Sequence, residues 1–250
     1  MEGAEEAIQA ATMLAKTVEL KDAYTEEHCE RLAEMALAIG KRIALTEKRL
    51  EQLRYSALLH DVGKLGIEDD ILGKPGRLTP SEWVEIRRHP RIGKEIVEKI
   101  NGLGSMARMV EEHHERVDGK GYPKGLKGDD ILLEARIVAV AVAYDAMRSD
   151  RPYRGALSRE EAIKELKKNA GSQFDSLVVK AFLEILDEGS VAPTQTGSRR
   201  IPARRSRFRR IHQDAAILFC ILILSSARRS VLIVPVWLHA GMSKTFRIVE

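Results

Sequence analysis

Apolar residues recur every three or four positions through most of residues 5–190, which is the spacing of one face of an α-helix. The segment 5–20 places Ile8, Ala11, Ala15 and Val18 on one side in this way. The same pattern predicts helices from Thr25 to Ile43, then over 47–60, from Pro80, over 92–100, 106–114, 131–147 and 177–186, with another after Ser158. No segment alternates as a strand would, so the sequence predicts an all-α fold.

Local signals sharpen two of these helix starts. Thr79 and Glu82 form a capping box with Pro80 at the first helical position, and Ser158 with Glu161 forms a second box. Near the middle of this region, Pro90 disfavours helical geometry for His89, so a break between helices is expected there.

The segment 131–147 is apolar almost all round, interrupted by Glu134, Arg136 and Asp145. A helix of this kind is buried on every side. The alternative of a strand fails on length, because strands usually run about 4–8 residues.

Composition and charge divide the chain near residue 190. With 250 residues and 44% hydrophobic content, one large domain or two small ones are expected. Residues 1–196 carry 30 Lys and Arg against 35 Asp and Glu, whereas 197–250 carry 11 against 2. Because the body lacks a basic excess, binding of duplex nucleic acid is not expected of it.

The C-terminal stretch 191–250 has another character. A basic run, RRIPARRSRFRR, precedes the apolar runs AAILFCILILSS and VLIVPVWLHA, each too short to span a bilayer, which takes about 20 residues. A membrane-surface segment is one interpretation. We favour a disordered extension or a segment foreign to the domain, so we predict a body over 1–190 and an extension over 191–250 with little membrane contact.

The cysteines and the N-terminal residues indicate the cellular compartment in which the protein is expected. Cys29 and Cys220 show no CxxC spacing, so neither a disulfide framework nor a thiolate zinc site is indicated. The start, MEGAEEAIQA, lacks the basic and apolar regions of an export signal. The sequence therefore predicts a cytoplasmic protein, and no input domain is expected before the first helix.

Histidines and acids gather at the ends of the predicted helices. His60-Asp61 and His113-His114 are adjacent pairs, and the chain also has His28 near a helix start. Neutral imidazoles and carboxylates that converge in this way are typical ligands of a divalent first-row transition metal. For His28 alone, a solvated histidine near an acidic helix start is the simpler interpretation.

Longer motifs contain these residues in a fixed order. They are His28, the HDxGK motif from His60 to Lys64, His89-Pro90, the stretch HHERVDGKGYP over 113–123, and the RPYR run over 151–154. In this the chain resembles the HD-GYP family of metal-dependent phosphodiesterases over roughly residues 8–187. The resemblance implies an HD-domain-like helical bundle that hydrolyses cyclic di-GMP to pGpG or GMP.

The resemblance also implies a site. Two metal ions, iron or manganese, would be held with Asp61 as the bridge, and a hydroxide between them would attack the phosphodiester. The implied ligands are His28, His60, Asp61, His89, His113 and His114. Lys64 would stabilise charge in the transition state, and the implied substrate-binding residues are Gly121, Tyr122, Pro123, Arg151 and Arg154. For Tyr122, a packed loop anchor is an equal alternative. Tyr24 stands where some members have a glutamate for a third metal, so two metals are expected.

One position departs from the family. Where members read VAD, with the acid as a metal ligand, this chain has Val140-Ala141-Val142. Asp145 lies one helical turn on, about 4.5 Å along the axis, and cannot take over the same bond. We therefore expect the metal near His28 and His60 to be held weakly. Two alternatives to a cyclic di-GMP phosphodiesterase follow: a broader HD-type nucleotide phosphohydrolase, or a module that binds the nucleotide or a diguanylate cyclase with a GGDEF domain.

Overall fold

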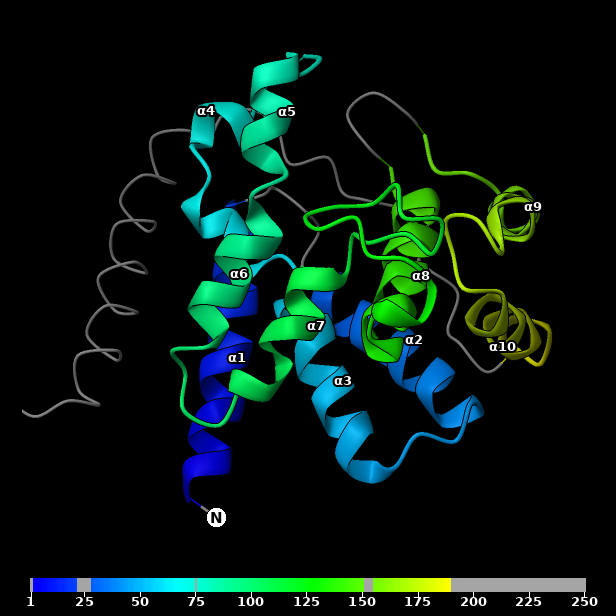
Figure 1. Ribbon diagram of the computed structural model, residues 1–250, viewed down its shortest axis with the longest axis horizontal. Helices are drawn as coiled ribbons and strands as arrows, with labels where there is room; N and C mark the ends of the chain where they lie inside the picture. Colours follow the sequence, from blue (N-terminus) through cyan, green and yellow to red (C-terminus); the bar gives the residue numbers. More distant parts are fainter. Residues whose placement is uncertain (1, 22–27, 75, 151–154, 190–250) are drawn as a thin grey trace, which may run out of the picture. The chain divides into compact units, whose positions relative to one another are not determined.

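The computed structural model describes residues 2–21, 28–74, 76–150 and 155–189, and the regular elements among them are all helical (Figure 1). The α-helices are α1 (Glu2–Lys21), α2 (His28–Arg42), α3 (Glu47–Leu59), α4 (Asp69–Leu72), α5 (Pro80–Ile86), α6 (His89–Val97), α7 (Ala107–Glu112), α8 (Leu133–Arg148), α9 (Arg159–Asn169) and α10 (Ser176–Asp187). Three short 3-10 helices join them: η1 (Val62–Gly66), η2 (Gly104–Met106) and η3 (Gly128–Asp130). The predicted all-α fold is confirmed.

The helix starts follow the local signals. Both predicted capping boxes are present: Thr79 accepts a hydrogen bond from the Glu82 amide, and Ser158 accepts one from the Glu161 amide. The Glu82 and Glu161 carboxylates in turn accept hydrogen bonds from the backbone amides of Thr79 and Ser158. These reciprocal bonds satisfy backbone donors that the first turn of a helix cannot satisfy itself.

Three predicted boundaries differ from the structure. The expected break is present, but it falls at Arg87 and Arg88, and α6 already begins at His89. A proline is tolerated in a first turn, where its missing amide hydrogen is not needed. The helix then ends at Val97, short of the predicted Ile100, and α7 ends at Glu112, just before the histidine pair that the prediction had placed inside it.

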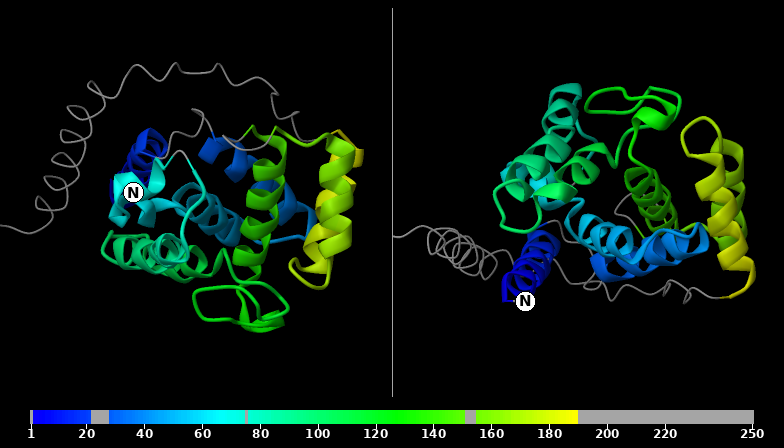
Figure 2. Two further views of the ribbon diagram at one scale, coloured as in Figure 1. Left: turned by 90° about the horizontal axis from the view of Figure 1, so that it is seen from above. Right: turned by 60° about the horizontal axis from the view of Figure 1, so that its bottom comes forward.

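The core lies where α2 and α3 pack together and against α8, with α10 closing one side (Figure 2). Phe182 of α10 is fully buried, and its ring meets Tyr144 of α8 edge to face at a centroid distance of 4.9 Å. Every residue of α8 is buried or half-buried, which confirms the helix predicted to be covered on all sides. This packing fixes α3 and α8, from which much of the site is built.

Some predictions fall on residues outside this description. They are Thr25 as the start of the second helix, Tyr24, Arg151, Arg154 and the extension 191–250. These stay predictions. Among the helices that the structure describes, none combines the length and the hydropathy that crossing a membrane requires.

Candidate metal centre

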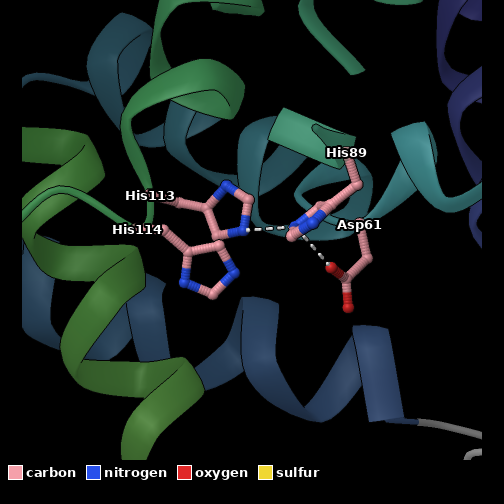
Figure 3. Close-up of side chains that lie close together, drawn as sticks. All are labelled: Asp61, His89, His113 and His114. Carbon is pink, nitrogen blue, oxygen red and sulfur yellow. Dashed lines mark hydrogen bonds and ion pairs between the residues drawn. The ribbon is translucent and has the colours of Figure 1, made fainter. Parts of the chain in front are cut away.

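Four side chains from distant parts of the sequence converge on one point (Figure 3). Asp61 follows α3, His89 begins α6, and His113 and His114 follow α7. One potential ligand atom from each lies within 4.8 Å of those of the other three. A carboxylate and three imidazoles at this separation form the donor set of a divalent transition-metal site.

Three of the histidines are oriented by the same device. Each stands at the end of a helix or just past it, and its Nδ1 lies close to the carbonyl oxygen three residues back. The distances are 2.7 Å from His60 to Ala57, 2.8 Å from His89 to Ile86 and 2.7 Å from His113 to Val110. The last carbonyls of a helix lack a partner within the helix. Because a carbonyl only accepts, Nδ1 carries the proton and Nε2 presents its lone pair to the centre, as in metal-ligating histidines.

The Nε2 atoms meet in a way that suits a cation. His89 Nε2 and His113 Nε2 are 3.3 Å apart. With both Nδ1 atoms protonated, two lone pairs face each other, and a positive ion between them would remove their repulsion. His60 Nε2 is buried and has no hydrogen-bond partner of good geometry among the described residues. A buried acceptor without a partner calls for an explanation, and an ion supplies one.

Asp61 faces two sets of histidines with its two oxygens. Oδ1 lies 3.2 Å from His89 Nε2, while Oδ2 lies 3.2 Å from His60 Nε2 and accepts a hydrogen bond of 2.8 Å from Lys64 Nζ. Burial opposes ionisation of Asp61, but the positive charge of Lys64 favours the carboxylate, and the pKa of the carboxyl lies well below its usual range. The carboxylate is therefore ionised and placed to bridge two positions.

The histidine pair is held neutral. Burial lowers the pKa of His113 well below its usual value, and the neighbouring His114 and His89 lower it further. Burial, and next His89, lower the pKa of His114 to about 3. A neutral imidazole is the form that binds a metal.

A close backbone crossing brings Asp61 beside His89. A Cβ added to Gly63 of η1 would lie 1.8 Å from the His89 carbonyl oxygen and 2.5 Å from the Gly93 amide nitrogen. No side chain can enter that space, so η1 packs directly on the backbone of α6. The HDxGK motif therefore needs this glycine to bring the carboxylate to the histidines of another helix.

His28 is buried and lies outside the group of four. Its ring centroid is 5.9 Å from that of His60, and its Nδ1 is 2.7 Å from Asp145 Oδ2. Arg31 Nε donates to the other oxygen of Asp145 at 2.7 Å. Burial alone would raise the pKa of Asp145, but His28 and Arg31 lower it to about 2. His28 is therefore not a solvated histidine, which was the simpler interpretation of the sequence. Asp145 contacts His28 and is not one of the four converging groups.

A pocket of about 370 Å³ opens beside His113 and His114. Its wall is apolar on the side of α8 and Phe174, where Ala139, Val142 and Ala143 line it. Three cationic side chains, Arg87, Arg116 and Lys120, also line the pocket, together with Glu115 and Gln173. The Arg116 guanidinium donates two hydrogen bonds, of 2.9 and 2.6 Å, to the Asp118 carboxylate, and these bonds fix its orientation.

The loop over 118–127 closes onto the histidine pair. The Tyr122 ring stacks on His114 at 4.7 Å, and the Arg87 guanidinium lies 5.4 Å from the centre of the Tyr122 ring. A Cβ on Gly121 would lie 2.4 Å from the Arg116 amide nitrogen, so a glycine is needed here for the loop to pack against the backbone at Arg116. The peptide bond between Tyr122 and Pro123 is cis.

Known proteins share this architecture. Residues 12–178 match the family model of the HD domain. The chain belongs to the HD domain family. Over 182 residues it is 40% identical to a cyclic di-GMP phosphodiesterase response regulator of Xanthomonas campestris, a match that covers 70% of this chain and 47% of that protein. Over 176 residues it is 38% identical to a 3'3'-cGAMP-specific phosphodiesterase of Vibrio cholerae, covering 70% and 38%.

A solved structure agrees on the fold. The crystal structure of a cyclic GMP-AMP-specific phosphodiesterase of Vibrio cholerae covers 86% of this chain and 58% of that chain, with a TM-score of 0.59 at 20% identity. The HD-GYP resemblance drawn from the motifs is confirmed by these relatives. The chain spans less than half the length of the two curated relatives named above.

Within this HD domain the structure gathers most of the predicted ligands. Asp61, His89, His113 and His114 form the group of four, and His60 stands at the second oxygen of Asp61. Lys64 touches Asp61, Tyr122 packs on His114, and Gly121 and Pro123 flank it in the loop. Whether these side chains bind metal or substrate stays a prediction.

Sequence reasoning missed three contributors. Buried Glu115 accepts the amides of Lys124, Gly125 and Leu126 and so ties down the loop, and its place after the histidine pair was the available signal. Asp145 pairs with His28 across 117 positions of sequence, and nothing local could indicate that. Arg87 lies two residues before His89, but its direction toward Tyr122 depends on the turn between α5 and α6.

Proposed function

We propose that this HD domain hydrolyses a phosphodiester bond of cyclic di-GMP, giving linear pGpG and then GMP. The observation that carries the proposal is the convergence of the Asp61 carboxylate and three imidazoles beside a pocket that three cationic side chains line. The names of the curated relatives, which act on cyclic dinucleotides, support the same substrate class.

We infer two divalent ions, iron or manganese. His89, His113, His114 and Asp61 are suited to hold one, and His28, His60 and Asp61 are the candidates for the other. Bound there, such ions supply Lewis acidity toward the phosphate oxygens. Bound metal ions agree with one observation: the Nε2 lone pairs of His89, His113 and His60 face the centre.

The remaining residues act on the substrate. Arg87, Arg116 and Lys120 line the pocket where the phosphates would lie, and guanidinium groups bind phosphate oxygens in pairs. Lys64 holds the second oxygen of Asp61 and thereby fixes the direction of the bridge. Arg151 and Arg154, outside the described residues, stay proposed as further phosphate ligands.

The proposal is tested by incubating the full chain, loaded with manganese or anaerobically with ferrous iron, with cyclic di-GMP and separating the products by chromatography. We expect pGpG to appear with metal and not after chelation. If cyclic di-GMP remains intact while ordinary nucleotides are cleaved, the broader phosphohydrolase replaces this proposal.

A second candidate rests on a specific observation. Val142 lines the pocket where the family has a ligand, and Asp145 is committed to His28 and Arg31. A metal site that lacks one ligand favours a binding module without turnover. Such a module would bind either the cyclic nucleotide or a partner protein, such as a diguanylate cyclase that contains a GGDEF domain. In the experiment above, binding of cyclic di-GMP without any product would select this candidate.

A further inference from the structure

An apolar groove lies on the outer side of α5, next to the pocket of the candidate centre. It has a volume of about 400 Å³ and is lined by Leu78, Pro80, Trp83, Val84 and Arg87. Trp83 is 48% exposed and Val84 61% exposed. A large aromatic side chain left this open beside a functional pocket indicates a binding surface more often than an isolated exposed leucine does.

Arg87 joins the groove to the pocket, since it lines both. It follows Trp83 by four residues, and its amide donates to the Trp83 carbonyl at 3.0 Å, so the two side chains leave the same face of one helical turn. From Arg87 the contacts continue to the Tyr122 ring at 5.4 Å and from Tyr122 to His114 at 4.7 Å. An unbroken path therefore leads from the exposed indole to the centre.

The pocket alone is small for the proposed substrate. At about 370 Å³ it stands near the lower end of the ~300–1,000 Å³ that ligand pockets span. A cyclic dinucleotide carries two bases and two phosphates, and we assign one base to the apolar wall of Ala139, Val142 and Ala143. The second base needs a flat surface beyond the cations.

We propose that the groove of Leu78, Trp83 and Val84 holds the second nucleobase of the cyclic dinucleotide, stacked on the Trp83 indole, while Arg87 lies against the phosphate between the two bases. The proposal rests on the proposed function and adds a subsite to it. Aromatic rings such as indole stack on nucleobases of any kind, and cationic groups such as guanidinium bind the phosphates. Among the described residues Arg87 forms no ion pair, and its guanidinium lies over the Tyr122 ring, so its charge is open to an anion.

The test measures binding of cyclic di-GMP to the metal-loaded full chain by isothermal titration. Stacking of a base on an aromatic ring contributes enough that Trp83→Ala should raise Kd about tenfold. Trp83→Phe should restore most of the affinity, because it keeps an aromatic face. Leu177→Ala, which truncates another exposed apolar side chain of 59% exposure on α10, should leave Kd unchanged.

Inorganic phosphate is the second probe, because it has no base. The proposal requires that Trp83→Ala leave phosphate binding as it is in the unaltered chain. Equal Kd values for cyclic di-GMP in Trp83→Ala and Leu177→Ala would overturn it and assign the groove to another occupant, such as a protein partner. Parallel loss of both ligands would also overturn it, because Trp83 would then support the centre itself. If the unaltered chain does not bind cyclic di-GMP at all, the proposed function fails, and that outcome is distinct from either of these.

Discussion

The two oxygens of Asp61 face two groups of histidines, and the two groups differ in how many potential metal ligands they contain. On the side of Oδ1, His89, His113 and His114 gather within 4.8 Å with the carboxylate. On the side of Oδ2, His60 is oriented in the same way, but His28 is engaged by Asp145. The acid that the family resemblance implies as a further ligand of this side is replaced by Val142. Ligand number decides affinity in such sites, so the histidine-rich side should fill first.

The comparison also shows what each side depends on. The histidine-rich side is assembled by tight backbone contacts and carbonyl tethers, which any metal-free state retains. The other side contains a buried ion pair network of His28, Asp145 and Arg31 that stabilises itself without an ion. A site that satisfies its own charges has less to gain from a metal.

The largest effect is expected from removing a ligand on the complete side. His113→Ala deletes one of four converging donors, and even changes to residues behind a ligand weaken metal affinity about 10–100-fold. We expect metal content near zero and a loss of any cyclic di-GMP cleavage by more than about 100-fold. Elemental analysis and product chromatography check this. Full metal content in His113→Ala would contradict the assignment of this side.

The next effect concerns the backbone crossing that joins the two motifs. In Gly63→Ala the new methyl group would meet the His89 carbonyl at 1.8 Å, and backbone atoms cannot yield as a side chain can. We expect destabilisation by about 3 kcal/mol or more, together with loss of metal. Thermal unfolding measures it. Gly76→Ala is the matched control, since nothing lies within 4 Å of its added Cβ, and a similar loss in both variants would refute the role of the crossing.

How much of this was available from the sequence depends on the range of each signal. Capping boxes and apolar periodicity are local, and they predicted most helices and the buried α8. The family motifs predicted that His60, His89, His113 and His114 would gather around Asp61, although these histidines lie up to 54 positions apart. The pairing of Asp145 with His28 and the direction of Arg87 could not be predicted, because each depends on how separate helices pack.

The incomplete side can be repaired in principle. Val142→Asp places a carboxylate in the pocket wall beside the histidine pair, at the position where the family has its ligand. We expect metal content to rise from about one to about two ions per chain and turnover to increase about tenfold or more, since two-metal sites stabilise both the attacking and the leaving oxygen.

Ala143→Asp is the control for that change, because it adds the same charge to the same pocket wall at a neighbouring position on α8. Equal metal content and turnover in the unaltered chain and Val142→Asp would mean that Val142 does not limit the site. A gain of the same size in Ala143→Asp would mean that added charge, and not a ligand at position 142, is responsible.

The smallest effect should come from His28 itself. Because His28 lies outside the group of four and its Nδ1 faces Asp145, His28→Ala should leave the first metal ion in place. It should still lower stability by about 1–3 kcal/mol, since the buried Asp145 carboxylate loses one of its partners. Arg31→Ala removes another partner of Asp145 and keeps the imidazole. If His28 is a metal ligand as well as an ion-pair partner, only His28→Ala will reduce metal content in a Val142→Asp background, whereas both single changes will reduce the free energy of unfolding. Equal metal content in the two variants would reduce His28 to a structural partner of Asp145, and the centre would then be a site for one ion built wholly on the other side of Asp61.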